Sequence, residues 1–379
     1  MADWKVPLSD VRFTEAEVAA VADVYRSGWL SQGPSVAAFE AAMSAYLGVS
    51  EAIAVASGTA ALHLACVAAG LGAGDEVVLP SLTFAATAAV VHHVGATPVF
   101  ADIRAVDRPW LSADAAAAAI GPRTRAIITM SYGGHPGEVL ALRELAHAQG
   151  LMLIEDAAHA LGASAGGAPV GTIGDFGAFS FFANKNMPLG EGGLLVARDP
   201  ELARRCRLLR SHGLTADTWA RHRGEEASYD VLEPGFNYRL DEPRAALGQL
   251  LLGHLDRDNR VRARLAGSYE QALACIDGAR GAIAVAREPQ SAWHIYPLLL
   301  ERGSDRSRFR DGLRANGVQT SLHYPPLHRT RAFASSAGAG LPETEEYAQR
   351  TVTVPLFAHM TEAQLGHVLD AIGRVFMGS

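Results

Sequence analysis

Apolar positions in the first half of the chain fall into short runs separated by longer segments of small and mixed residues. The short runs predict strands, at 52–56, 76–80, 97–102, 125–130 and 151–156. Helices are predicted in the segments between them, at 58–70, 83–94, 112–120 and 137–149. Short apolar strands that alternate with helices are typical of a mostly parallel central sheet with helices on both faces. The pattern therefore predicts an α/β fold.

The two ends of the chain show helical patterns. Thr14 and Glu17 have the spacing of a capping box, so the first helix is expected to begin there, and a second is expected at 34–46. After residue 255 the pattern changes to long charged helices with few strands. The helices are expected at 257–275, 304–316 and 361–376, and a strand is expected at 293–300. We therefore predict a large domain of residues 1–255, whose N-terminal helices are free to pack on a smaller α+β domain of residues 256–379.

Two polar segments interrupt this pattern. Segment 213–234 has several charges and no clear periodicity, which predicts a long loop. Loops of that length in compact domains are usually functional or mobile. The basic run 203–210 predicts a solvated helix face or an interface rather than a phosphate clamp.

Composition narrows the class of protein. The chain has 379 residues, 49% of them hydrophobic, and 38 glycines, which suits a compact α/β protein rather than a disordered one. The formal net charge of −7 argues against nucleic acid as a partner, because the surface would repel phosphates. Three widely spaced cysteines indicate neither a disulfide framework nor a metal site. Without a signal segment or an apolar run of membrane-spanning length, the chain is expected to be cytoplasmic, with no membrane contact.

Lys185 lies at an unusual place in the sequence. The apolar residues 178–183 have the character of a buried strand, and they lead directly into Lys185 between two asparagines. A buried lysine is costly unless its charge is paired or its pKa falls, and a lowered pKa makes a lysine nucleophilic. Two interpretations are open. Either the strand has ended and Lys185 points to solvent from an ordinary turn, or Lys185 is a reactive amine.

Several polar groups are predicted to lie at one edge of the sheet. Ligands bind beyond the carboxyl ends of parallel strands, and segment 57–59, Phe84 and Asp156 each follow such an end. Asp156 alone could cap a helix, but an aspartate and a lysine together are the protein groups that pyridoxal phosphate (PLP) chemistry needs. The helix after 57–59 begins with free N–H groups that suit an anion. The glycine-rich run 70–76 is expected to be a turn, because a dinucleotide loop requires the opposite order of strand and helix.

Seven segments taken together closely resemble the DegT/StrS-type sugar aminotransferases, and they extend over nearly the whole chain. They are GWLSQGP (28–34), SGTAALHLA (57–65), EDAAHALGA (155–163), GDFGAFSFFANKNMPLGEGG (174–193), NYRLDEPRAALGQL (237–250), HYPPLH (323–328) and LPETEEYAQRTVTVPL (341–356). The resemblance implies the PLP-dependent transferase fold of type I, that of aspartate aminotransferase. In that fold a mostly parallel central sheet is covered by helices, and a smaller α+β domain follows at the C-terminal end.

The resemblance implies a role for each matching position. Lys185 would bind PLP covalently and move the proton, and Asp156 would pair with the pyridine nitrogen, so these two are the expected catalytic residues. The other positions at the cofactor would be His159 at the ring or its phenolic oxygen, Phe84 stacked on the ring, and Gly58, Thr59 and Ser180 at the phosphate. Asn237 would reach the phosphate of the neighbouring subunit's cofactor, which implies a homodimer with shared active sites. Positions near the sugar nucleotide would be Trp29, Arg239, His323, Tyr324 and His328. No metal is expected.

The reaction implied by the resemblance uses L-glutamate as amino donor and a nucleotide-diphosphate ketosugar as acceptor. The sequences EDAAHA (155–160) and KNMPLGEGG (185–193) favour amination at C-4 of dTDP-4-keto-6-deoxy-D-glucose. Two alternatives stay open, a C-3 ketosugar aminotransferase and a non-catalytic PLP-fold regulator. A sister group of the same fold removes a hydroxyl group and has His where this chain has Lys185, so the lysine favours transamination.

Overall fold

Most of the chain is built around one seven-stranded sheet. The computed structural model describes residues 4–216, 218–225, 228–283, 291–336 and 340–377. Along the sheet the strands are β1 (Ile53–Val55), β11 (Gly193–Ala197), β10 (Phe176–Ser180), β7 (Met152–Asp156), β6 (Thr124–Met130), β2 (Glu76–Pro80) and β3 (Thr97–Ala101). Neighbouring strands are parallel except at β11, which runs antiparallel to both β1 and β10. The mostly parallel sheet is confirmed, and β11 is a strand that the sequence pattern does not predict.

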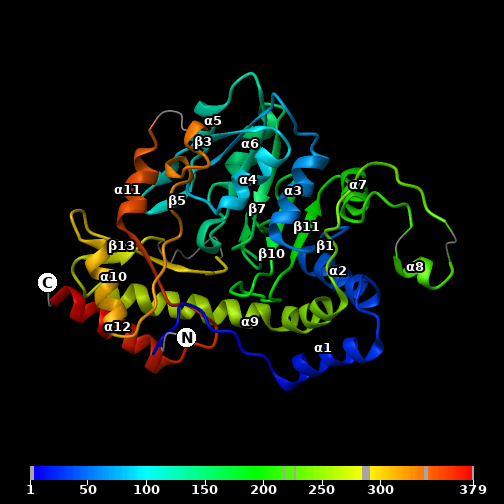
Figure 1. Cartoon of the computed structure of the whole chain (residues 1–379). Coiled ribbons are helices and arrows are strands. Elements are labelled where there is room, and N and C mark those ends of the chain that lie inside the picture. The colour runs from blue at the N-terminus through cyan, green and yellow to red at the C-terminus, as the bar shows by residue number, and fades with distance from the viewer. Residues whose placement is uncertain (1–3, 217, 226–227, 284–290, 337–339, 378–379) are drawn as a thin grey trace.

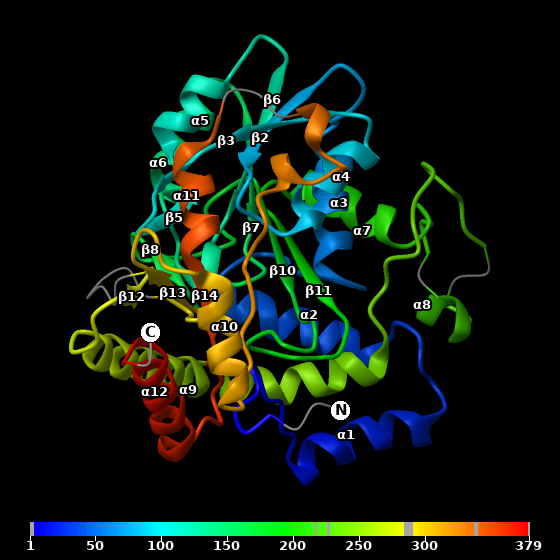
Figure 2. The same ribbon diagram turned by 60° about the vertical axis from the view of Figure 1, so that its left-hand side comes forward.

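Helices cover both faces of this sheet (Figures 1 and 2). They are α1 (Glu15–Ser27), α2 (Pro34–Leu47), α3 (Gly58–Ala68), α4 (Ala85–His93), α5 (Ala113–Ala119), α6 (Val139–Ala148) and α7 (Pro200–Arg210). Alternate residues of β2 pack on opposite faces: Val77 and Leu79 join the core under α3 and α4, and Val78 joins the core under α5 and α6. Because both faces are covered, β2 is apolar from Val77 onward instead of alternating between apolar and polar residues. The predicted capping box of Thr14 and Glu17 is present at the start of α1.

The helix α9 is longer than the sequence pattern predicts. It extends over Glu242–Leu273 instead of beginning at 257, and the Asp241 side chain caps it by accepting from the backbone N–H of Arg244. The helix passes beneath the large sheet and reaches the C-terminal elements (Figures 1 and 2). The predicted boundary at residue 255 therefore falls inside a continuous helix, and a division of the chain there stays a prediction.

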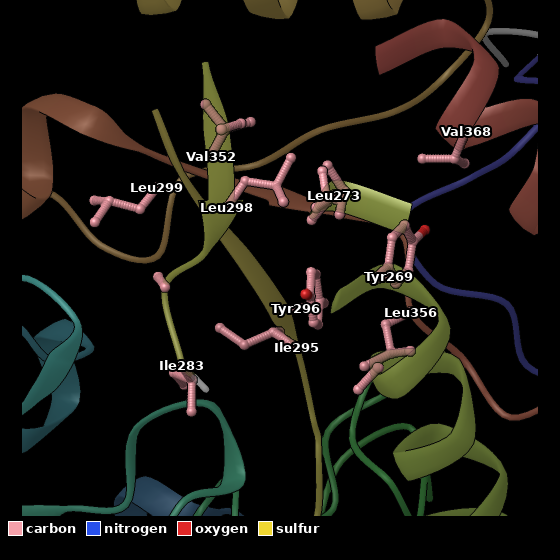
Figure 3. Packing of buried hydrophobic residues seen from close by; sticks show 14 of the residues in the cluster. Tyr269, Leu273, Ile283, Ile295, Tyr296, Leu298, Leu299, Val352, Leu356 and Val368 are labelled. Atoms are coloured by element: carbon pink, nitrogen blue, oxygen red, sulfur yellow. The ribbon is translucent and has the colours of Figure 1, made fainter. Parts of the chain in front are cut away.

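A second, antiparallel sheet follows α9. Its strands are β12 (Ala279–Gly281), β13 (Tyr296–Leu300) and β14 (Thr351–Val354). The helices of this part are α10 (Arg306–Ala315), α11 (Pro342–Arg350) and α12 (Glu362–Met377). Two small antiparallel sheets of two strands each lie elsewhere in the chain: β4 (Ile103–Ala105) pairs with β5 (Arg108–Leu111), and β8 (Ser164–Ala165) pairs with β9 (Ala168–Pro169). In the core of this part, Tyr269 of α9 stacks on Tyr296 of β13 with ring centroids 4.7 Å apart (Figure 3). The predicted α+β character of the C-terminal part is confirmed.

Two predictions about polar segments need correction. Segment 213–234 contains a short helix, α8 (Thr218–His222), so it is not a loop throughout. The basic run 203–210 lies on α7, but Arg210 is only 2% exposed, because it donates to the Glu40 carboxylate and to the Ala54 carbonyl. Arg210 thus belongs to a buried ion pair and not to a solvated face.

Within the described ranges, no helix combines the length and the apolar character needed to cross a bilayer. In the same ranges, no group of three or more His, Cys, Asp and Glu side chains could hold a metal ion.

Candidate active site

The predicted site residues follow the carboxyl ends of neighbouring strands. Asp156 ends β7, Ser180 ends β10, and the turn that opens α3 follows β1. Phe84 follows β2 and stands directly before α4. Because β10 and β7 are neighbours in the sheet and β1 is joined to β10 through β11, the sheet brings these positions to one edge, as the sequence predicts.

Asp156 is a buried carboxylate held by neutral groups. It is 3% exposed, and it accepts from the Thr87 hydroxyl at 2.7 Å and from the backbone N–H of Ala158 at 3.2 Å. Burial raises the pKa of its carboxyl, and the two hydrogen bonds and the charge of Lys185 oppose that rise. In the part of the chain that the structure describes, no basic side chain forms an ion pair with Asp156, and no helix begins directly after it. The helix-cap interpretation therefore fails, and the site suits a cation that hydrogen-bonds to this carboxylate.

Lys185 lies in a tight turn beyond β10. Its backbone N–H donates to the Phe182 carbonyl at 2.9 Å. Burial lowers the pKa of its amine to about 8, and the nearby Asp156 carboxylate partly offsets that effect. A cavity of about 260 Å³ adjoins it, lined also by the N-terminal segment and by α9. The reactive-amine interpretation of Lys185 is therefore the one that its surroundings support.

Three buried histidines, His159, His294 and His323, lie near enough to Lys185 for its charge to lower their pKa values. His159 is 2% exposed, its Nε2 lies 3.0 Å from the Tyr324 hydroxyl, and its ring centroid lies 4.2 Å from that of His294. Burial, with the nearby charge of Lys185, holds the pKa of His159 well below its usual value and lowers that of His323 to about 4. These imidazoles are therefore neutral at physiological pH. The Nδ1 of His159 is buried, and no described residue forms a hydrogen bond with it.

The turn before α3 has the form of an anion site. Ser57 caps the helix by accepting from the Ala60 N–H at 3.1 Å, and the first N–H groups, at Gly58 and Thr59, have no partner within the helix. A Cβ atom on Gly58 would lie 2.9 Å from the Cβ of Ser180, so only glycine allows this close approach. The hydroxyl of Ser180 thus stands beside the positive end of α3.

These observations fit PLP. A buried carboxylate with no ion-pair partner among the described residues suits the pyridine nitrogen, an amine of lowered pKa suits the aldehyde carbon, and a helix N-terminus beside a serine suits the phosphate. The unpartnered Nδ1 of His159 is a further polar group that a ligand could satisfy. Phe84, 56% exposed with its ring 5.8 Å from that of Tyr324, is free to cover a planar ring.

The remaining predicted positions have other contacts in the structure. Trp29 packs its ring on Trp219 and His222, with centroids 4.8 and 4.5 Å away. Asn237 is exposed, and Arg239 pairs with Val55 beside β1. These positions are compatible with the predicted contacts to a neighbouring subunit or a nucleotide, which stay predictions.

Of the predicted sugar-nucleotide positions, His328 has the least freedom to bind a substrate. Its Nδ1 lies 2.7 Å from the Ser81 hydroxyl and its Nε2 lies 3.1 Å from the Glu345 carboxylate. Both ring nitrogens are thus occupied by protein groups. The substrate contact of His328 stays a prediction.

Sequence reasoning missed three residues of the site. Thr87 lies in the first turn of α4, just after the strand end that Phe84 follows, so its position in the sequence could have indicated it. Asn186 and His294 contact each other across 108 residues of sequence, and no local pattern marks that contact.

Several known proteins are similar to this chain in sequence and in structure. Residues 12–373 match the model of the DegT/DnrJ/EryC1/StrS aminotransferase family. The chain is 36% identical over 384 residues to the spore coat polysaccharide biosynthesis protein SpsC of Bacillus subtilis. The aligned region covers 99% of this chain and 98% of that protein. The aminotransferase TlmJ of Streptoalloteichus hindustanus is similar in structure, with a TM-score of 0.92, 34% identity and coverage of 98% of this chain and 99% of that one. The sugar aminotransferase CalS13 of Micromonospora echinospora gives a TM-score of 0.88, 32% identity and coverage of 97% and 99%. Structures of further similar proteins include PLP and PMP forms.

Proposed function

The chain belongs to the DegT/DnrJ/EryC1/StrS aminotransferase family, and on that basis we propose that it transfers the amino group of L-glutamate to a nucleotide-linked ketosugar. The family makes it a PLP-dependent sugar aminotransferase, which removes the non-catalytic regulator from the alternatives. The proposal concerns the finer points. The acceptor is dTDP-4-keto-6-deoxy-D-glucose, the reacting carbon is C-4, and the donor is L-glutamate.

The residues of the chain account for the proton movements of such a transfer. Bound PLP supplies a conjugated ring that takes up the electron pair left when the Cα proton of an amino acid is removed. Asp156, buried and without an ion-pair partner among the described residues, stabilises a proton on the ring nitrogen. Lys185, with a pKa of about 8, has enough neutral amine to accept the Cα proton and enough ammonium to return one. The charges of Lys185 and Asp156 act on the pKa values of His159 and Tyr324, respectively, and these two side chains lie 3.0 Å apart, so both lie near the reacting groups.

One observation carries the proposal: Lys185 lies beyond the end of β10 and Asp156 ends the neighbouring strand β7, near enough for each charge to affect the pKa of the other group. A lysine can form the covalent link and also move the proton, whereas the related hydroxyl-removing enzymes have His at this position. The chain is therefore equipped for the transfer of nitrogen.

The choice of C-4 rests on narrower support. The amino-acid sequences of residues 155–160 and 185–193 favour a 4-keto-6-deoxy sugar as the acceptor. These segments lie at the carboxyl end of β7 and in the turn around Lys185, so both border the reacting centre. The C-3 alternative uses the same cofactor residues and differs only in how the sugar is placed.

The proposed active unit is a homodimer in which Asn237 reaches the cofactor of the neighbouring subunit. Asn237 is exposed, and the nearby apolar side chains of Tyr229, Val231 and Leu232 are 52%, 52% and 57% exposed. Exposed apolar residues close together in one segment are typical of an interface. This surface supports the shared site.

A panel of dTDP- and UDP-linked 3-keto and 4-keto sugars, assayed with L-glutamate and analysed by mass spectrometry, tests the proposal. We expect the aminated product from dTDP-4-keto-6-deoxy-D-glucose. Product from 3-keto sugars alone would replace the proposal by its C-3 alternative. Product only with another amino acid would contradict the assignment of the donor.

A further inference from the structure

The Asn186 side chain joins the turn that carries Lys185 to two other parts of the chain. Its Nδ2 donates to the Oδ1 of Asn259 on α9 at 2.8 Å and to the Ala292 carbonyl at 2.7 Å. Its Oδ1 lies 3.1 Å from the Nδ1 of His294. Because Asn186 directly follows Lys185, these contacts fix the backbone from which the reactive side chain extends.

Two carbonyl groups set the direction of every hydrogen bond in this network. A carbonyl oxygen can only accept, so the atom of Asn186 that faces Ala292 is the amide nitrogen. Asn259 likewise donates to the Leu161 carbonyl at 3.0 Å, which leaves its Oδ1 to accept from Asn186. The Asn186 oxygen is therefore an acceptor, and the Nδ1 of His294 must carry a proton. Burial keeps the pKa of His294 well below its usual value, so the ring is neutral and the proton is on Nδ1 alone.

His294 is itself held firmly in place. It is 4% exposed, its ring packs against that of His159, and its carbonyl accepts from Arg262 of α9 at 3.4 Å. The preceding residue, Trp293, has a φ of 44°, which is rare for a residue other than glycine and costs free energy. Such a conformation persists only where the surroundings over-determine it.

We propose that Asn186 and His294 are positioning residues that aim the Lys185 amine for proton transfer. The inference rests on the proposed function of Lys185. Asn259 extends the hydrogen bonds from Asn186 to Leu161, five residues after Asp156, so one residue of α9 sets the positions of both catalytic segments. His294 adds the segment that leads into β13 to the same frame.

This role has a specific kinetic consequence. Proton transfer needs the reacting atoms at about 3–3.5 Å, and a displacement of about 1 Å can cost about a hundredfold in rate. Without the Asn186 contacts, Lys185 still captures PLP, because its amine is unchanged, but it meets the Cα proton in poorer geometry. The chemical step slows more than binding weakens.

His294→Asn and His294→Gln form a matched pair that separates positioning from packing. The side-chain nitrogen of asparagine takes the place of Nδ1, and that of glutamine takes the place of Nε2, so only the asparagine variant can donate to Asn186. Glutamine is larger and fills more of the volume of the ring, so a packing role predicts the glutamine variant to be the better enzyme. We expect the opposite order, with kcat lowered about tenfold or more in His294→Gln and in Asn186→Ala and mostly recovered in His294→Asn.

The measurements use the PLP-loaded enzyme. We expect KM values within about threefold of the wild type in both low-activity variants, because substrate contacts are unchanged. With L-glutamate deuterated at Cα, the isotope effect on the half-reaction should rise in both, because proton transfer becomes rate-limiting. The visible circular dichroism of the bound cofactor should weaken while the far-UV signal stays unchanged, a change that a purely structural role would not produce.

Three results would overturn the inference. The first is equal kcat values for His294→Asn and His294→Gln, and the second is a higher kcat for His294→Gln. The third is loss of the far-UV circular dichroism of the folded protein in both His294 variants. If the wild type binds PLP at Lys185 but does not react with L-glutamate, the donor assignment of the proposed function fails. In that case the visible circular dichroism of the two variants still decides the positioning role.

Discussion

Burial and the Asp156 carboxylate act on Lys185 in opposite directions, and burial has the larger effect, so the amine has a pKa of about 8. Only the neutral amine attacks the PLP aldehyde. Capture of PLP by the cofactor-free protein should therefore accelerate about tenfold per pH unit below pH about 8 and level off above it. Stopped-flow absorbance measures the rate. Nα-acetyl-lysine, whose side-chain amine titrates at about 10.4, is the control, and a protein rate that follows the control to high pH would contradict the assignment.

Asp156 should be needed for the reaction but not for the fold. Asp156→Asn cannot hold the pyridine proton, so we expect kcat to fall at least about a hundredfold with little change in thermal midpoint. Thr87→Val removes one of the hydrogen bonds to this carboxylate and should cost less than Asp156→Asn. Near-normal turnover of Asp156→Asn would show that the carboxylate has no part in the chemistry.

The catalytic roles of Lys185 and Asp156 stay predictions, but their positions at and beyond the ends of β7 and β10 could be predicted from the sequence, because apolar runs mark both strands. The residues that hold them could not. Asn186 meets Asn259 across 73 residues and His294 across 108, and such contacts exist only after the chain has folded.

Among the elements, β7 supports the site from its other face. Glu155 precedes Asp156 and therefore points to the opposite side of the sheet. It is fully buried and accepts from the backbone N–H groups of Gly171, Ile173 and Gly174 at 2.8, 2.7 and 2.6 Å. These bonds fix the turn that leads into β10 and so toward Lys185.

Glu155→Ala leaves those three buried N–H groups without an acceptor. Each buried N–H group without an acceptor costs about 1–3 kcal/mol, so we expect the free energy of unfolding to fall by about 3 kcal/mol or more. The fall should be smaller in Glu155→Gln, which keeps one side-chain oxygen as an acceptor. Urea denaturation of the cofactor-free protein measures the change. Glu201→Ala, which removes an exposed ion pair on α7, is the matched control and should stay within about 0.5 kcal/mol. Equal effects of Glu155→Ala and Glu201→Ala would contradict this account of the turn.

Elements with a uniform environment were predictable, and α9 was not. The strand at 76–80 has the predicted bounds because its residues from Val77 to Leu79 are apolar and are buried on both faces of the sheet. The first half of α9 buries Ala245, Leu247 and Leu255 in the core of the large sheet, whereas its second half is more charged. The change of composition at 257 marks a change of neighbours along one helix and not the start of a new element.

For the whole molecule, the shared active site makes a prediction about mixed dimers. If Asn237 serves the neighbouring cofactor, a dimer of one Lys185→Ala chain and one Asn237→Ala chain has both defects in one site and none in the other. Random re-association of equal amounts should then restore about a quarter of normal site activity. If Asn237 acts within its own chain, mixing restores nothing. Subunit exchange, followed by native mass spectrometry, is the control that makes a negative result decisive.

The central claim, that Lys185 is the residue that binds PLP covalently, is tested most directly by borohydride reduction and peptide mass spectrometry. The PLP-loaded protein should be yellow, and reduction should fix the cofactor on Lys185 alone. Lys185→Ala, treated in the same way, should bind PLP reversibly and give no adduct. An adduct on another lysine, or none in the wild type, would contradict the account.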